Sequence, residues 1–272
     1  MKSFFREIYL RRDLVRELVV RDLKVRYARS ALGILWVFFS PLLTVAVFYL
    51  IFFLFLKVNT AEAPFILYLM TAVFTWRFFQ DSLMCSVTSL VDNRNLVRES
   101  NFPHYLIPLS IVFSNAIIFM SSLVILLISV FVLKEFSVWV LFLPLVLSVH
   151  FIIVLGLSII SSVIYVRCRD LKYVLEALLL LLFYLTPAFY SISLVKNSFP
   201  RLLFEIYLYN PFTVILNLYR FTLLKGCYVV IHEDISLIAS VLSIFVFALF
   251  VLCLALWYYK KYRLKINDYL SY

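Results

Sequence analysis

Two oppositely charged side chains stand in the middle of an apolar stretch of the sequence. Arg77 and Asp81 interrupt the run from residue 63 to residue 91 at i,i+4 spacing, which places them on adjacent turns of one helix face. Within a membrane such a pair partly neutralises itself, whereas either charge alone would be expensive. We expect a structural ion pair inside a helix bundle, with a polar spot on a conduit or subunit seam as the alternative.

Residue types that support nucleotide, metal or disulfide chemistry are sparse. The three glycines lie far apart, which excludes a P-loop and a dinucleotide fingerprint: Gly33, Gly156 and Gly226. The cysteines and histidines are also scattered, which excludes zinc motifs and a disulfide framework: Cys85, Cys168, Cys227, Cys253, His104, His150 and His232. We therefore predict no catalytic residue, metal or cofactor in this chain. Its energy must come from a partner or an ion gradient.

The composition of the 272 residues is that of a membrane protein. Hydrophobic residues make up 65% and charged residues 15%, with a mean hydropathy of +1.03. A soluble domain has about 45–50% apolar and about 25% charged residues. A soluble enzyme and a disordered chain are both excluded, and an all-α membrane protein is predicted.

Uncharged stretches predict six transmembrane helices within a transmembrane domain at residues 30–259. About 20 residues rising about 1.5 Å each cross a hydrocarbon core of about 30 Å. The apolar run after the fifth span is too short to cross, so short re-entrant helices are predicted at 206–226. The predicted spans are residues 31–56, 63–91, 105–133, 137–166, 173–195 and 235–259.

The positive charges predict the orientation. Most of the 25 Lys and Arg residues lie in residues 1–29, in the loop 92–104, after the fourth span and in the tail 260–272. By the positive-inside rule both termini are cytoplasmic. The net charge of +10 then reflects topology and contact with membrane lipids, and no nucleic-acid partner is predicted. The first apolar run is too long for a cleaved signal, so it is predicted to remain as the first span.

Three segments carry further functional hypotheses. Residues 1–29 predict an amphipathic interface helix, either a surface anchor or a lever that meets a partner or an anionic headgroup. The loop 92–104 places apolar residues among charges, which favours a docking element over a hairpin turn held against the membrane. Aromatic residues make up 18% of the chain, and those deep in the spans could stack on sugar rings or serve plain packing and lipid contact.

Three sequence blocks together resemble the membrane subunit of ABC-2 type polysaccharide exporters, the Wzm-type and TagG-type permeases. The resemblance extends over nearly the whole chain, and the order and spacing of the blocks make it specific. The blocks are residues 21–27 with 30, 32–36 and 40–42, residues 95–98 with 102–103 and 106–110, and residues 169–170 with 184–187, 190–191, 210–211 and 219–220.

This resemblance implies an ABC-2 (type V exporter) permease fold and a homodimer that binds two copies of a separate Wzt-like ATP-binding subunit. ATP and Mg would lie on that partner, so the chain is a transport subunit in the inner membrane and not an enzyme. Its cargo would be undecaprenyl-diphosphate-linked polysaccharide, O antigen or similar, moved outward during lipopolysaccharide biosynthesis. Alternatives are a permease for another lipid-linked glycan, teichoic acid, lipid or drug, and a membrane glycosyltransferase or acyltransferase.

The resemblance also suggests roles for individual residues. Contacts to the lipid diphosphate are expected from Arg12, Arg16, Arg26 and Arg29. The glycan path is expected to be lined by Trp36, Phe48, Tyr49, Phe52, Tyr184 and Tyr190. Coupling to the ATPase subunit is expected through Leu96, Val97, Arg98, Glu99, Phe102 and Pro103. The extracytoplasmic gate is expected to include Asn210, Pro211, Tyr219 and Arg220.

Overall fold

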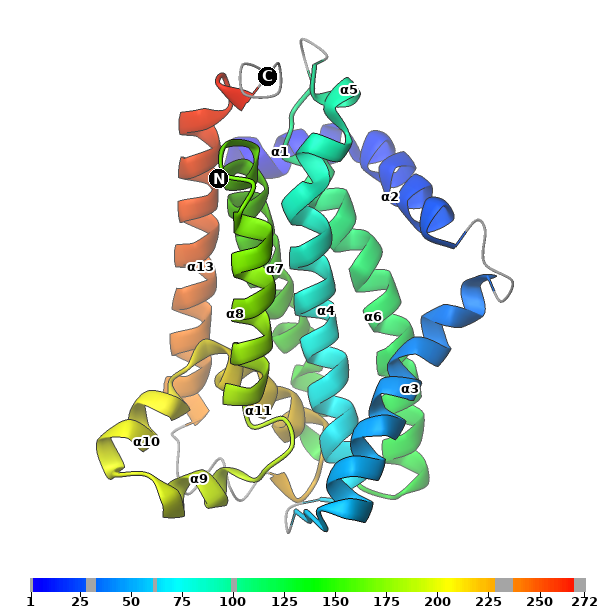
Figure 1. The fold of residues 1–272 in the computed structure, drawn as a ribbon, viewed down its shortest axis with the longest axis vertical. Coiled ribbons are helices and arrows are strands. Elements are labelled where there is room, and N and C mark those ends of the chain that lie inside the picture. The colour runs from blue at the N-terminus through cyan, green and yellow to red at the C-terminus, as the bar shows by residue number, and fades with distance from the viewer. Residues whose placement is uncertain (1, 28–32, 61–62, 99–101, 228–236, 267–272) are drawn as a thin grey trace.

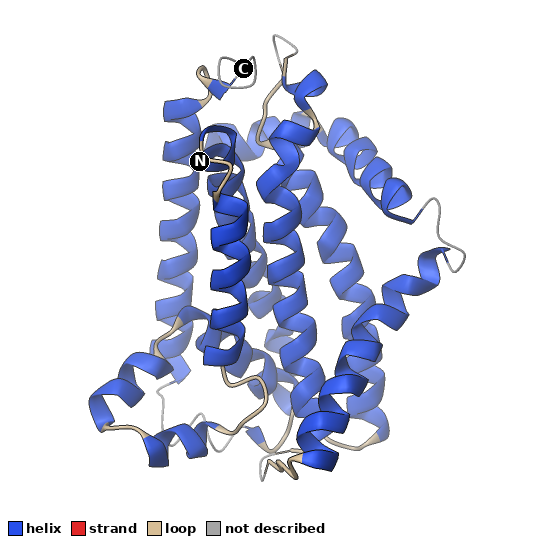
Figure 2. Ribbon diagram, viewed as in Figure 1, coloured by secondary structure: helices blue, strands red, loops and turns tan. Residues whose placement is uncertain are grey.

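The computed structural model describes residues 2–27, 33–60, 63–98, 102–227 and 237–266. Within these ranges the regular elements are helices, and Figure 2 shows them as one bundle. The first part of the chain forms α1 (Lys2–Leu10), α2 (Arg12–Tyr27), α3 (Trp36–Tyr49) with a π-helical continuation (Leu50–Phe55), α4 (Phe65–Asp92), α5 (Arg94–Val97) and α6 (Leu106–Val132). The second part forms a 3₁₀ turn (Val138–Phe142), α7 (Leu143–Arg167), α8 (Leu171–Leu185), α9 (Ile192–Ser198), α10 (Arg201–Leu208), α11 (Pro211–Leu223) and α13 (Leu237–Tyr262).

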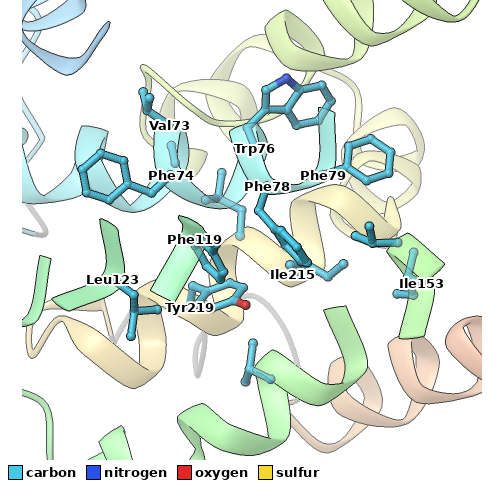
Figure 3. Packing of buried hydrophobic residues seen from close by; sticks show 14 of the residues in the cluster. Val73, Phe74, Trp76, Phe78, Phe79, Phe119, Leu123, Ile153, Ile215 and Tyr219 are labelled. Carbon is cyan, nitrogen blue, oxygen red and sulfur yellow. The ribbon is translucent and has the colours of Figure 1, made fainter. Parts of the chain in front are cut away.

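Helix α4 is the centre of the bundle. It packs against α3, α6, α7 and α8, while α13 packs along the other side of α7. Helices α1 and α5 and the carboxyl end of α13 lie at one end, called here the terminal end, and α9–α11 lie at the other, called here the distal end (Figure 1). In the core, the Phe78 ring stacks on Phe119 at 5.0 Å, and Tyr219 points toward them from α11 (Figure 3).

Four helical segments of the described chain are long and apolar enough to cross a membrane. They are residues 36–55, 106–132, 138–167 and 237–262. The predictions of an all-helical fold and of several membrane spans are therefore confirmed. Two of the six predicted spans differ from these four. Helix α4 has 28 residues but carries Arg77, Gln80 and Asp81, and α8 has only 15 residues.

The fifth predicted span, residues 173–195, is not one continuous helix. Helix α8 ends at Leu185, and the backbone of Thr186 is extended, with ψ at 152°. Thr186 precedes Pro187, whose ring disfavours the helical conformation in the preceding residue. The remainder of the predicted span forms a turn and the start of α9.

The amino-terminal segment forms two consecutive helices rather than one. Its apolar residues face one side as predicted, with Val15, Leu18 and Val19 buried in the main core. That face packs on α6 of the same chain, since α2 lies along it and Ser114 Oγ contacts the Val19 carbonyl at 3.5 Å. The amphipathic pattern therefore reflects a contact with another helix of the same chain.

Helices α7 and α13 approach each other closely at a glycine. A Cβ placed on Gly156 would lie 2.7 Å from Cγ1 of Val251 and 3.2 Å from two of its backbone atoms. Small residues allow such close backbone approach between helices in lipid. Gly156 therefore sets the distance between α7 and α13.

Candidate functional site

A polar cavity of about 310 Å³ lies where α2, α3, α4 and α6 meet. Pro41 lies in the wall of this cavity, where a proline inside α3 removes one backbone N–H and one helical hydrogen bond. Aromatic and hydrogen-bonding side chains share its surface. The lining residues are Arg26, Trp36, Val37, Ser40, Pro41, Phe74, Arg77, Phe78, Asp81, Asn115, Ile118, Phe119 and Ser122.

Two ion pairs organise the polar side of the cavity. Arg77 Nε lies 3.6 Å from Asp81 Oδ2, and Arg77 Nη1 donates to Ser40 Oγ at 2.9 Å. The predicted i,i+4 pair thus forms, but it lines a cavity instead of being sealed in the bundle. Arg26 Nη2 lies 3.5 Å from Asp22 Oδ2. Arg26 Nη1 also donates to Asn115 Oδ1 at 2.6 Å, which joins α2 to α6.

The arginines predicted to meet a lipid headgroup do not share one site. Arg26 belongs to the polar cavity, whereas the Arg12 guanidinium lies over the Tyr9 ring at 5.1 Å. Arg16 lines a separate shallow hollow of about 610 Å³ along α2, together with Arg21 and Lys24 and with the acidic residues Asp13 and Glu17. Arg29 lies outside the described residues.

The aromatic residues predicted to line a glycan path fall into separate groups. Trp36 borders the polar cavity. Phe48 and Phe52 instead pack on Phe189, at 4.9 and 4.4 Å between ring centroids, and Tyr184 lies 5.9 Å from that same ring. Tyr49 stacks on Phe53 at 4.7 Å. Within one chain these rings therefore form packed clusters, with Trp36 alone of the six in the polar cavity.

At the distal end, Arg220 of α11 is buried in the protein interior. Only 2% of the residue is exposed, and its guanidinium carbon lies 3.3 Å from the centroid of the Tyr68 ring. Nη2 donates to the carbonyl oxygens of Tyr68 and Ala188 at 3.3 and 3.2 Å. No described carboxylate forms an ion pair with it, and its Nε and Nη1 atoms have no hydrogen-bond partner. Arg220 thus ties α11 to α4 and to the turn after α8.

The other predicted gate residues shape and anchor α11. Asn210 caps the helix by accepting a hydrogen bond from the Phe212 N–H at 3.0 Å, and Pro211 occupies the first turn, where its missing N–H costs nothing. The Tyr219 hydroxyl lies 3.2 Å from Nδ1 of the buried His150 on α7. All four residues therefore fix the position of α11.

Tyrosine hydroxyls connect the neighbouring distal segments. Tyr68 donates to the Tyr190 carbonyl at 3.1 Å, Tyr190 donates to the Tyr184 carbonyl at 3.1 Å, and Tyr207 on α10 reaches the Tyr190 hydroxyl at 3.3 Å. Tyr190 thus belongs to a polar network that links α4, α8 and α10.

At the terminal end, the described apolar residues of the predicted coupling loop (residues 92–104) are not exposed, contrary to the expectation from sequence. Val97 is fully buried against Ile107 and Val163, and Leu96 and Phe102 are half-buried on the same cluster. Burial of these side chains holds α5 against the bundle, because the removal of apolar surface from water is favourable. The exposed surface of α5 and the residue after it is polar: Arg94, Asn95 and Arg98. Glu99 lies outside the described residues.

His104 holds the coupling loop in place. Its Nε2 lies 3.1 Å from the Val97 carbonyl, so the neutral ring with its proton on Nε2 donates this bond. The adjacent Tyr105 ring meets Tyr259 of α13 edge-on at 5.3 Å. Through these two residues the loop is in contact with the start of α6 and the end of α13.

We expect acid to weaken this attachment. Burial lowers the pKa of His104 below its usual value of 6.5. Because the folded pKa lies below the unfolded one, the stabilisation is complete above about pH 6.5 and falls as the pH drops below it. Thermal unfolding of the wild type and of His104→Gln should be compared at pH 7.5 and 5.5 (about one unit either side of 6.5).

In this comparison glutamine keeps a donor for Val97 but does not titrate. The wild type should therefore lose more stability on acidification than the variant, which retains the other two histidines as internal controls. An identical pH dependence of the two proteins would show that His104 does not sense the pH in this range.

Several residues of these sites had no role assigned from sequence. They are Ser40, Tyr68, Asn115, His104, His150, Phe189 and Tyr207. The sequence carries a signal for Asn115, because it is the one carboxamide residue within the apolar sequence of α6. The others are ordinary residues of membrane helices and loops, and only their spatial partners distinguish them.

The helical bundle and its four apolar segments define an all-helical membrane protein. Residues 13–224 match the family of ABC-2 type transporters, and the chain belongs to this family. The resemblance noted in the sequence is confirmed.

Two curated relatives make the similarity more specific. The chain is 30% identical over 253 residues to O-antigen export system permease protein RfbA of Klebsiella pneumoniae, covering 92% of this chain and 93% of the relative. It is 31% identical over 221 residues to a protein of the same name from Myxococcus xanthus, covering 81% and 84%. The similarity therefore spans nearly whole proteins in both cases.

Proposed function

We propose that this chain is the permease subunit of an ATP-driven exporter that moves undecaprenyl-diphosphate-linked polysaccharide, O antigen or similar, outward across the inner membrane. The observation that carries the proposal is the similarity to an O-antigen export permease over 92% of the chain. A chain whose three glycines form no P-loop needs a separate ATP-binding subunit as its energy source.

The six-span topology is part of this proposal. Helix α4 rises about 42 Å over its 28 residues, which exceeds a core of about 30 Å. Its charges face the polar cavity, which is where ionisable groups are tolerated in a membrane. Helix α8 rises about 22 Å, and the segment 186–195 would complete the crossing. Helices α10 and α11 would form the re-entrant gate.

The assembly is a homodimer with two copies of the ATP-binding subunit. Helices α3 and α8 leave large apolar side chains uncovered, among them Phe39, Leu43, Leu181 and Tyr184, and these suit either lipid or a second copy. The ATP-binding subunit would contact the exposed polar side chains of α5, because the apolar side chains of α5 are already buried against the bundle. With both termini cytoplasmic, Arg16, Arg21 and Lys24 on α2 would lie on the side of the membrane where the diphosphate of the lipid carrier enters.

The test combines genetics with reconstitution. Deletion of the gene should remove the polysaccharide from the cell surface and leave lipid-linked glycan inside, and the wild-type gene should restore export. The chain purified with the neighbouring ATP-binding subunit should form a two-plus-two complex in liposomes whose ATPase responds to the glycan lipid. Normal surface polysaccharide in the deletion strain, or no complex with the ATPase, would refute the proposal.

A further inference from the structure

The polar cavity between α2, α3, α4 and α6 contains charges that are already paired. Asp22 lies 3.5 Å from the guanidinium of Arg26, and Asp81 lies 3.6 Å from that of Arg77. A phosphate or diphosphate is bound best by cations whose donors are free to converge on it. Paired charges cancel one another but still offer donors and acceptors side by side, which is what vicinal hydroxyl groups require.

One buried donor in the cavity wall has no partner. Asn115 is 3% exposed, and its Oδ1 atom accepts from Arg26 at 2.6 Å. Its Nδ2 atom has no hydrogen-bond partner, although the residue lines the cavity. An unsatisfied buried N–H group is costly, and a ligand oxygen entering the cavity would satisfy it.

Part of the wall is aromatic. Trp36 is 40% exposed at the edge of the cavity, and Phe74 and Phe119 line its interior. Aromatic faces suit the apolar C–H faces of sugar rings. The volume of about 310 Å³ lies at the lower end of the range of small-molecule sites, about 300–1,000 Å³. It therefore suits a short stretch of glycan rather than a whole chain.

We propose that this cavity binds a sugar unit of the exported glycan, where the interface helix meets the first span. Asn115 Nδ2 donates to a sugar oxygen, Asp81 accepts from a hydroxyl, and Trp36 stacks on the ring. The assignment rests on the proposed function, because it takes the cargo to be a glycan. The lipid diphosphate then binds elsewhere on the chain.

The test measures sugar binding directly through tryptophan fluorescence. The chain in complex with its ATP-binding subunit is titrated with a panel of methyl glycosides and, separately, with inorganic diphosphate. At least one glycoside should change the emission saturably at millimolar concentration, and diphosphate should not. The change should disappear in Trp36→Phe.

Two carboxamide variants locate the site. Asn115→Asp keeps the acceptor for Arg26 but removes the free donor, so binding should weaken about fivefold, as expected for one hydrogen bond. Asn217→Asp is the matched control, because Asn217 on α11 also has a buried Nδ2 without a partner but lies outside the cavity. This control should bind the glycoside like the wild type.

Three results would overturn the sugar site: an emission change with diphosphate alone, the same glycoside response in Trp36→Phe, or no glycoside response in the wild type. None of these depends on export. If deletion of the gene abolishes surface polysaccharide while no glycoside binds at Trp36, the exporter stands and the sugar site fails. If deletion leaves the surface unchanged, the proposed function fails whatever the cavity binds.

Discussion

Replacing Arg220 with methionine is expected to abolish export while leaving the protein folded. The guanidinium is buried with no carboxylate of the described residues beside it, and within that part of the chain Nε and Nη1 have no hydrogen-bond partner. Burying a charge is costly, and an apolar side chain of similar length avoids this cost. The variant should therefore accumulate to normal levels, with an unfolding free energy within about 2 kcal/mol of the wild type.

The loss of function follows from what Arg220 holds together. Its Nη2 bonds and its contact with Tyr68 join α11, α4 and the turn at Ala188. Methionine makes none of these polar contacts, so the distal segments are no longer held in one arrangement. We expect at least a tenfold fall in surface polysaccharide, about 1.4 kcal/mol or more in the transport step.

Controls separate this role from a general effect of charge. Arg201→Met removes an exposed arginine at the same end of the molecule, whose side chain is 92% exposed, and should export normally. Tyr68→Leu removes the ring beneath the guanidinium and should resemble Arg220→Met. Wild-type export by Arg220→Met would show that these contacts are dispensable, and failure to accumulate would show that the charge is needed for folding.

Replacing Gly156 with leucine is expected to prevent stable folding. Even a methyl group at this position would lie 2.7 Å from Cγ1 of Val251 and 3.2 Å from its backbone. The side chain could turn away, but the backbone of α13 could move only with the whole helix. Overpacking typically costs about 1–3 kcal/mol, and leucine adds several more atoms than alanine. The variant should be degraded or aggregate on size-exclusion chromatography.

A compensating substitution tests whether the contact with Val251 is the cause. Gly156→Ala alone should lower the unfolding temperature, and Val251→Ala in the same chain should recover much of the loss by removing the side-chain clash. Val246→Leu, on the outward face of α13 where Val246 is 63% exposed, serves as the control and should leave stability unchanged. A stable Gly156→Leu protein would show that α7 and α13 can separate without cost.

The sequence alone determined the class of the molecule, because class depends on composition and local order. Long uncharged stretches can only be apolar helices in lipid, and three widely spaced glycines cannot form a nucleotide-binding loop. The i,i+4 spacing of Arg77 and Asp81 predicted their ion pair, since it depends only on helix geometry. The ordered blocks along the chain also sufficed to indicate the ABC-2 family.

The tertiary structure alone decided which helices meet and what their side chains do there. Arg26 donates a hydrogen bond to Asn115, 89 positions away in the sequence, and Arg220 donates one to the Tyr68 carbonyl, 152 positions away. In the loop 92–104, the sequence pattern favoured docking through apolar residues, but in the structure Val97 is buried and its neighbour Arg98 is exposed. The physical reason is that lipid and protein interior are equally apolar, so hydrophobic periodicity does not distinguish a helix face that meets another helix from one that meets lipid.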